Sequence, residues 1–231
     1  MLDSAIMMNP QVWVASGHVG SFSDPLMECR DCHTRHRADK LVEEGLERDA
    51  AFLIPANWSG DKTPLDDFNF YIKLGHIACP NCGATNWTDI QKFNLMLSTH
   101  QGTTEDSTSL VYLRPETAQG IFINFANIAR SSRKKVPFGV AQYGKAFRNE
   151  ITPQKFIFRT REFEQIEIEY FCEPGTDEKF FQMWHDEEFR FFTEVLGFAP
   201  DKVRFVEIPA EGLPHYSKRA GDFEYEFPFG W

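Results

Sequence analysis

The sequence predicts an α+β fold in which an antiparallel β-sheet is flanked by helices and carries a cysteine-rich insertion. Charged and apolar residues alternate over 144–150 and 162–170, as in two strands joined by a loop. Between 118 and 129, apolar residues recur at helical spacing. Two Cys-x-x-Cys pairs precede both patterns, at 29–32 and 79–82. Because the expected strands outnumber the helices and hairpins join them, a Rossmann fold is excluded.

Length and composition narrow the class of protein. The 231 residues suffice for a large core, and 23 phenylalanines predict one rich in aromatic rings. The net charge of −10 argues against a chain that wraps nucleic acid over its whole surface. One basic cluster fits either a helix C-terminus or a local RNA contact: Arg130, Arg133, Lys134 and Lys135. No apolar run reaches the roughly 20 residues of a membrane span, and no signal peptide is visible, so we expect a cytoplasmic protein without a membrane partner.

The N-terminal half divides into three expected segments. Residues 1–28 indicate strand and loop, and 29–97 form a cysteine-punctuated subdomain with a short helix over 37–45. The next twelve residues, 98–109, form a polar stretch. A polar connection of this length is either mobile or a functional flap.

The C-terminal half, within residues 98–231, predicts two helices and two further strands. One helix begins near Glu116; a second is capped by Thr176 and ended by Gly197. Strands are expected over 203–208 and 223–229. Because the chain stops inside the last alternating pattern, we expect a fragment of a longer protein.

The paired cysteines favour a structural zinc site in a zinc-ribbon-like insertion. Two thiolates two residues apart bind one face of a tetrahedral ion, and a second pair completes it. The ligands would be Cys29, Cys32, Cys79 and Cys82. The alternative is four buried or free thiols, and His33 or His36 could compete as ligands. Cys172 is expected in the core.

Polar residues gather on one face of the two expected strands around the loop. Period two places Arg148 and Glu150 beyond the small residues Gly144 and Ala146, which would leave room above the sheet. On the second strand Phe163, Gln165, Glu167 and Glu169 share one face. A solvated amphipathic hairpin would show the same alternation, so this pattern alone leaves both interpretations open.

The order of these residues resembles motif 2 of the class II aminoacyl-tRNA synthetases. Phe147-Arg148-Asn149-Glu150 is followed by a loop, by Arg159 and Phe163 four residues apart, and then by Glu167. The stretches Ala15–His18, Phe22–Pro25 and Tyr112–Phe122 resemble the dimeric glycyl-tRNA synthetases in particular. The resemblance covers nearly the whole chain. It implies a class II catalytic core with 1–28 as a motif 1 remnant, 29–97 as an insertion and 98–231 truncated before motif 3.

The resemblance implies an ATP site along motif 2. Arg148 would be the catalytic residue, bridging the ATP α-phosphate and the amino-acid carboxylate. Glu150 would accept from the adenine amino group, Phe163 would stack on adenine, and Arg159, with Arg161 as a weaker candidate, would reach the terminal phosphates. The nucleotide-binding set is Arg148, Asn149, Glu150, Phe158, Arg159, Thr160, Arg161, Glu162 and Phe163. Mg²⁺ would accompany ATP, with its usual ligands outside residues 1–231.

The same resemblance implies a glycine pocket that excludes side chains and binds the ammonium group. Glu116 and Glu167 are the principal candidates, although Glu116 alone could simply face a helix N-terminus. Arg37 is a candidate for contact with substrate or the tRNA end, or else a solvated helix arginine. The implied set is Arg37, Glu116, Phe163, Glu164, Gln165, Ile166 and Glu167.

The implied activity is ATP-dependent glycine–tRNA ligation, in which glycyl-adenylate forms and glycine passes to the 3′ end of tRNA(Gly). The parent protein would be a homodimer. Without motif 3 and the anticodon-binding domain, the fragment would be weakly active or inactive. Three alternatives are a binding-only relative, another adenylate-forming ligase and a zinc-ribbon nucleic-acid module. The joint presence of Arg148, Glu150, Arg159 and Phe163 argues against the first, and the acidic charge against the last.

Overall fold

A computed structural model describes residues 1–48, 65–74, 77–153, 156–214 and 216–231. The chain separates into two compact units. Unit 1 comprises Met1–Lys134 and Gly139–Glu169, and unit 2 comprises Lys135–Phe138 and Tyr170–Trp231. Among the described residues, no helix is sufficiently long and apolar to cross a bilayer.

Unit 1 begins with short elements: β1 (Met7–Met8), α1 (Pro10–Ala15), α2 (His18–Ser21) and β2 (Ser23–Glu28). The expectation of strand and loop alone was therefore wrong. Asn9 caps α1, because its side chain accepts a hydrogen bond from the Gln11 N–H at 2.9 Å. Gly17, at φ 83°, turns the chain into α2 through a left-handed conformation that favours glycine.

The polar stretch 98–109 is part of an antiparallel hairpin rather than an unstructured flap. It supplies β5 (Ser98–His100), which pairs with β6 (Leu110–Leu113), and β6 pairs with β1 on its other side. The Asp106 carboxylate accepts hydrogen bonds from the backbone N–H groups of Thr108 and Ser109 at 2.8 and 3.0 Å, which closes the loop. Trp13, fully buried, packs with Met8 and Met96 beside this sheet.

The cysteine-rich subdomain has its own sheet and core. β2 pairs antiparallel with β3 (Arg35–Arg37) and with β4 (Gln91–Asn94). Two helices accompany the sheet, α3 (Ala38–Arg48) and α4 (Leu65–Leu74). The helix expected over 37–45 therefore starts one residue later and runs past Gly45. Its core contains these buried residues: Met27, Cys29, Ala38, Leu41, Val42, Ile72, Ile77, Cys79, Trp87 and Ile90.

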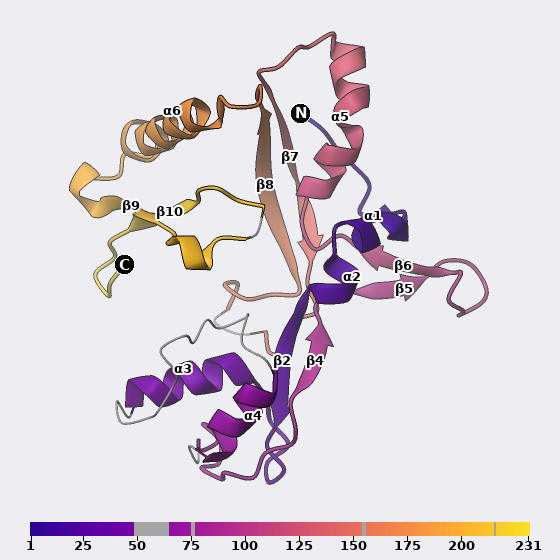
Figure 1. The fold of residues 1–231 in the computed structure, drawn as a ribbon, viewed down its shortest axis with the longest axis vertical. Helices are drawn as coiled ribbons and strands as arrows, with labels where there is room; N and C mark the ends of the chain where they lie inside the picture. Colours follow the sequence, from indigo (N-terminus) through magenta and orange to yellow (C-terminus); the bar gives the residue numbers. More distant parts are fainter. Residues whose placement is uncertain (49–64, 75–76, 154–155, 215) are drawn as a thin grey trace. The chain divides into compact units, whose positions relative to one another are not determined.

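One helix and two long strands, which belong to unit 1 for most of their length, frame the candidate site. β7 (Phe138–Phe147) pairs with β8 (Glu162–Phe171), and α5 (Ala118–Ser132) lies beside them in Figure 1. The expected periodicity of α5 is confirmed in part: Ile121 is fully buried, whereas Phe122 is half exposed. Along β8 the odd-numbered residues from Phe163 to Glu169 are half-buried, and the even-numbered ones from Glu164 to Ile168 are exposed.

Unit 2 joins a helix to a hairpin through aromatic rings. α6 (Asp177–Arg190) continues as a π-helical turn (Phe191–Val195), and β9 (Val203–Glu207) pairs antiparallel with β10 (Gly221–Tyr225). The strand expected to reach residue 229 ends at Tyr225. Thr176 does precede α6, but its hydroxyl donates to the Glu173 carbonyl rather than capping the helix. From α6, His185 packs against Phe205 and Phe223, with ring centroids 4.8 and 5.3 Å away.

Candidate active site

Arg148, just beyond the end of β7, lies between two aromatic rings. Its guanidinium carbon is 5.4 Å from the centroid of Phe22 and 5.3 Å from that of Phe163. Its Nε donates to the Pro115 carbonyl at 3.2 Å. The rings fix the plane of the cation, while its remaining donors can serve an anion. A planar guanidinium in this setting suits bidentate contact with a carboxylate or phosphate.

Glu116, from the segment that leads into α5, is held by two neighbours. Its Oε1 lies 3.5 Å from His18 Nε2 and accepts a hydrogen bond from Gln119 Nε2 at 2.7 Å. The pKa of Glu116 is lowered, chiefly by His18 and with help from Gln119 and Arg148, against the opposing effect of burial. Glu116 is therefore an ionised carboxylate in a half-buried position.

Glu167 and Glu169 bring two more carboxylates to the same face of β8. Glu167 Oε2 accepts from the Thr117 N–H at 2.8 Å and from the Thr117 hydroxyl, and Thr117 is fully buried. Burial, followed by repulsion from Glu167 and Glu116, raises the pKa of Glu169 to about 7. Three carboxyl groups therefore interact electrostatically at this face of β8.

Two glutamine side chains add acceptors that lack partners. Gln119 Oε1 and Gln165 Oε1 are buried and accept no hydrogen bond from any described residue. Buried acceptors of this kind are costly unless a donor reaches them. Together with the carboxylates of Glu116 and Glu167, they make a site with excess acceptors. A small ligand with several N–H donors and a positive charge complements such a site.

A second group of motif 2 residues lines a cavity of about 610 Å³. Glu150 Oε2 lies 3.4 Å from Arg159 Nη1, and Arg161 Nε donates to the Glu150 carbonyl at 3.0 Å. Phe158 lines the same cavity. Its remaining wall comes largely from the cysteine-rich subdomain: Asp24, Thr34, Arg35, His36, Arg37, Lys40, Leu41, Glu44 and Pro80, with Ile151 and Thr152 from the loop. This cavity offers an aromatic side chain, a carboxylate and several cations, as nucleotide binding requires.

Three predicted residues point away from this face of β8. Glu162 pairs with Lys145, Glu164 hydrogen-bonds to Tyr143, and Ile166 is 70% exposed. The structure therefore does not bring the side chains of Glu162, Glu164 and Ile166 to the site. Period two of the strand is the reason, because they alternate with Phe163, Gln165 and Glu167.

Asn149 and Thr160 both hydrogen-bond to backbone carbonyl groups. The Asn149 N–H donates to the Leu95 carbonyl at 2.8 Å, which ties the end of β7 to the segment after β4. The Thr160 hydroxyl donates to the Glu162 carbonyl at 2.8 Å. These bonds shape the two ends of the motif 2 loop.

Arg37 lines the cavity, but its guanidinium already forms ion pairs with two aspartates. It lies on β3, with Nη1 3.1 Å from Asp24 Oδ2 and Nη2 2.6 Å from Asp39 Oδ2. Both aspartates are buried. The alternative of a solvated helix arginine was wrong, since Arg37 precedes α3 and links β2, β3 and α3.

The room expected above Gly144 is filled from within the protein. A Cβ at Gly144 would lie 2.5 Å from Arg114 Nη2. Arg114 is buried; its Nε donates to the Lys145 carbonyl at 2.7 Å and its Nη1 to the Ser4 carbonyl at 2.8 Å. The small residue thus accommodates a structural arginine and does not leave room for a ligand at this point of β7.

The four predicted metal ligands converge in the cysteine-rich subdomain. Their sulfur atoms all lie within 4.8 Å of one another, with Cys29 and Cys82 at 3.6 Å and Cys32 and Cys79 at 3.7 Å. His36 Nε2 lies 3.7 Å from the Cys79 sulfur. His33 instead pairs with Glu28 and is mostly exposed. The thiols can therefore hold one metal ion. Cys172 is half-buried in unit 2.

Comparisons with known proteins agree with this geometry. A family model described as the tRNA synthetase class II core domain (G, H, P, S and T) matches residues 102–225. This chain belongs to that class II core family. It is 58% identical to a glycine–tRNA ligase of Clostridium acetobutylicum and 54% identical to one of Acetivibrio thermocellus, over 100% of this chain in both cases. The chain spans about half the length of these curated relatives, 49% and 48%.

The class II match contains most of the site but not all of it. Arg148, Glu116 and Glu167 lie inside the matched range, whereas the four cysteines, Arg37 and two further site residues precede it. Those two, His18 and Phe22, were not assigned a role from the sequence. Both lie within stretches that resemble the synthetases, which was the available signal. Thr117 was also missed, although it directly follows Glu116.

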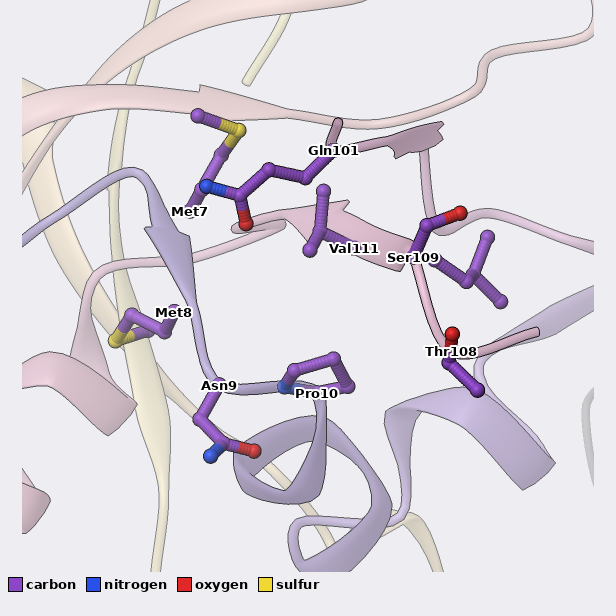
Figure 2. A pocket seen from close by; sticks show the side chains of 9 residues that line it. Met7, Met8, Asn9, Pro10, Gln101, Thr108, Ser109 and Val111 are labelled. Atoms are coloured by element: carbon purple, nitrogen blue, oxygen red, sulfur yellow. The ribbon is translucent and has the colours of Figure 1, made fainter. Parts of the chain in front are cut away.

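Unit 1 also contains a cavity of about 510 Å³ that is lined by none of the candidate site residues described above (Figure 2). Asn9 and Pro10, at the start of α1, line one side of this cavity. Gln101 and Thr108, from the β5–β6 hairpin, line the other side. None of its nine described lining residues is charged. It therefore lacks the carboxylates and arginines that gather around Glu116 and Arg148.

Proposed function

We propose that this chain carries the glycine and ATP sites of a glycine–tRNA ligase. The observation that carries the proposal is the group of acceptors beside one arginine. An ammonium group would bind to the carboxylates of Glu116 and Glu167 and to the side-chain oxygens of Gln119 and Gln165, which lack a hydrogen-bond partner among the described residues. Arg148, between its two rings, would receive the carboxylate at the other end of the same small molecule.

Every α-amino acid has the same two charged ends, so selection for glycine would have to come from walls that leave no room for a side chain. A pocket formed by buried hydrogen-bonding groups can discriminate strongly when a misfitting ligand leaves them unpaired. Thr117, fully buried, fixes Glu167 through two hydrogen bonds, so this wall cannot easily recede from a methyl group. The selectivity would thus arise from rigid acceptors.

ATP would occupy the neighbouring cavity beside the motif 2 loop. Arg148 would contact the α-phosphate, Phe163 would stack on adenine and Glu150 would accept from the adenine amino group. Arg159, now 3.4 Å from Glu150, would turn to the terminal phosphates. The other proposed nucleotide contacts are Asn149, Phe158, Thr160 and Arg161. Mg²⁺ accompanies ATP and offsets phosphate charge.

The proposed reaction needs no protein nucleophile. The glycine carboxylate attacks the α-phosphorus of ATP, pyrophosphate leaves and glycyl-adenylate forms. A hydroxyl of the terminal ribose of tRNA(Gly) then attacks the glycyl carbonyl carbon, and AMP leaves. Arg148 contributes by aligning the carboxylate with the phosphate and by stabilising the negative charge that develops there. The carboxylates of Glu116 and Glu167 would hold the ammonium end away from the reacting centre.

We further propose that Cys29, Cys32, Cys79 and Cys82 bind a structural zinc ion. A Zn–S bond of about 2.3 Å gives tetrahedral sulfurs about 3.8 Å apart, close to the observed 3.6 and 3.7 Å. Cys29 and Cys79 belong to the buried core of the subdomain, so metal binding would stabilise that core. The parent protein is proposed to be cytoplasmic and homodimeric.

A non-hydrolysable glycyl-adenylate analogue, glycyl-sulfamoyl-adenosine, tests the proposed site by calorimetric titration. Arg148→Leu should lower its affinity by about 10- to 100-fold, because hydrogen bonds to charged groups contribute roughly 1.5–3 kcal/mol. Arg133→Leu, at the exposed end of α5, is the control and should leave affinity unchanged. Equal binding by both variants would refute the role of Arg148.

A further inference from the structure

His18 connects the two ends of the proposed glycine site. Its ring packs edge-on against Trp13 and Phe22, with centroids 5.5 and 5.3 Å away. Phe22 in turn lies under the Arg148 guanidinium. A continuous series of rings therefore runs from the fully buried Trp13 to the arginine proposed to hold the carboxylate.

The hydrogen bonds of His18 define which nitrogen carries the proton. Nε2 faces Glu116 Oε1 at 3.5 Å, and only a protonated nitrogen is favourable beside a carboxylate. On the other side, Ser16 Oγ lies 2.8 Å from Nδ1. The Ser16 hydroxyl can therefore donate to Nδ1 in the tautomer that carries its proton on Nε2.

His18 is held in place by contacts beyond those of its own short helix. α2 has only four residues, but Gly17 precedes His18 in a left-handed conformation that favours glycine, and the side chain of His18 is only 12% exposed. The backbone N–H of Phe22 also bonds to the His18 carbonyl at 3.3 Å. Backbone and ring contacts together leave the imidazole little rotational freedom.

We propose that His18 is a positioning residue for amino-acid binding, which orients the Glu116 carboxylate toward the substrate ammonium. The inference rests on the proposed function, since it gives Glu116 its ligand. Without His18, Glu116 would retain Gln119 but lose the contact that most strongly favours its ionised form. The ammonium would then meet a carboxylate that is less ordered and more readily protonated.

His18→Phe separates this role from simple packing, because it keeps an aromatic ring and removes both nitrogens. Its affinity for glycyl-sulfamoyl-adenosine should fall by about 10-fold or more, the equivalent of one charge-assisted hydrogen bond. Affinity for acetyl-sulfamoyl-adenosine, which lacks the amine, should not change. His18→Gln retains an N–H donor and should restore part of the loss. His100→Phe, an exposed histidine on β5, is the matched control.

A second readout needs no ligand. NMR titration of ¹³C-labelled glutamate should show a higher pKa for Glu116 in His18→Phe than in the wild type, with no change in His100→Phe. Ser16→Ala, at an exposed position, should shift the same pKa in the same direction by a smaller amount if His18→Phe fails to fold.

Unchanged glycyl affinity with an unchanged Glu116 pKa would overturn the inference. Equal losses for the glycyl and acetyl compounds would also overturn it, because they would indicate a structural role. If the wild type binds neither compound, the proposed function fails separately. The Glu116 titration then decides whether His18 orients that carboxylate.

Discussion

Replacement of one cysteine should selectively destroy the proposed zinc site. Cys79→Ser removes a nearly buried thiol that lies 3.7 Å from the Cys32 sulfur. Structural zinc binding by small domains contributes about 10–16 kcal/mol over four ligands, or roughly 3 kcal/mol for each. A loss of this size corresponds to a decrease in zinc affinity of about 100-fold. Cys172→Ser, in unit 2, is the control and should have no effect on affinity.

The assay is competition for zinc with a chromophoric chelator, together with metal content by mass spectrometry. The wild type and Cys172→Ser should each carry one zinc per chain, and Cys79→Ser should lose it to the chelator. Cobalt substitution should give the absorption of a tetrahedral thiolate site only in the first two. Zinc binding of equal strength in all three proteins, or none in the wild type, would refute the reasoning.

Two further perturbations concern stability. Gly144→Ala should lower the free energy of unfolding by about 1–3 kcal/mol, because the new methyl group would clash with Arg114, which two backbone carbonyls hold in place. Gly20→Ala is the control, since the space around its Cβ position is open. Equal denaturation midpoints for the two variants would contradict this argument. Glu169 has a native pKa raised to about 7 from its ordinary 4.5, by burial and then by Glu167, so its contribution to stability falls as pH rises between these values. The melting temperature of Glu169→Gln minus that of the wild type should therefore increase between pH 5 and about pH 7.5 in parallel melting curves. A difference that stays constant over this range would show that Glu169 does not titrate there.

The sequence predicted the long elements and the polar face of β8 because each has a clear period. α5 shows helical spacing, and the side chains of Phe163, Gln165 and Glu167 alternate with exposed neighbours as expected. The cysteine spacing likewise predicted a cluster that the fold brings together. Local patterns sufficed in these cases, since a strand face and a Cys-x-x-Cys pair depend on neighbouring residues.

Features that depend on distant contacts could not be predicted. Nothing local indicates that Arg114 fills the space above Gly144, or that Arg37 is held by an aspartate on another strand. α1 and α2, of six and four residues, are too short to show a period. β5 was missed because its three residues are all exposed and polar. His18 gained a role only when folding placed it beside Glu116.

We propose that residues 1–231 contain a site that binds the two charged ends of glycine and leaves no room for a larger side chain. Calorimetric titration of the wild-type chain with glycyl-sulfamoyl-adenosine and alanyl-sulfamoyl-adenosine tests it most directly. We predict saturable binding of the glycyl compound at one site per chain, and binding of the alanyl compound that is weaker by at least about 10-fold. Equal affinities, or no binding of the glycyl compound by a chain that is shown to be folded, would contradict the claim.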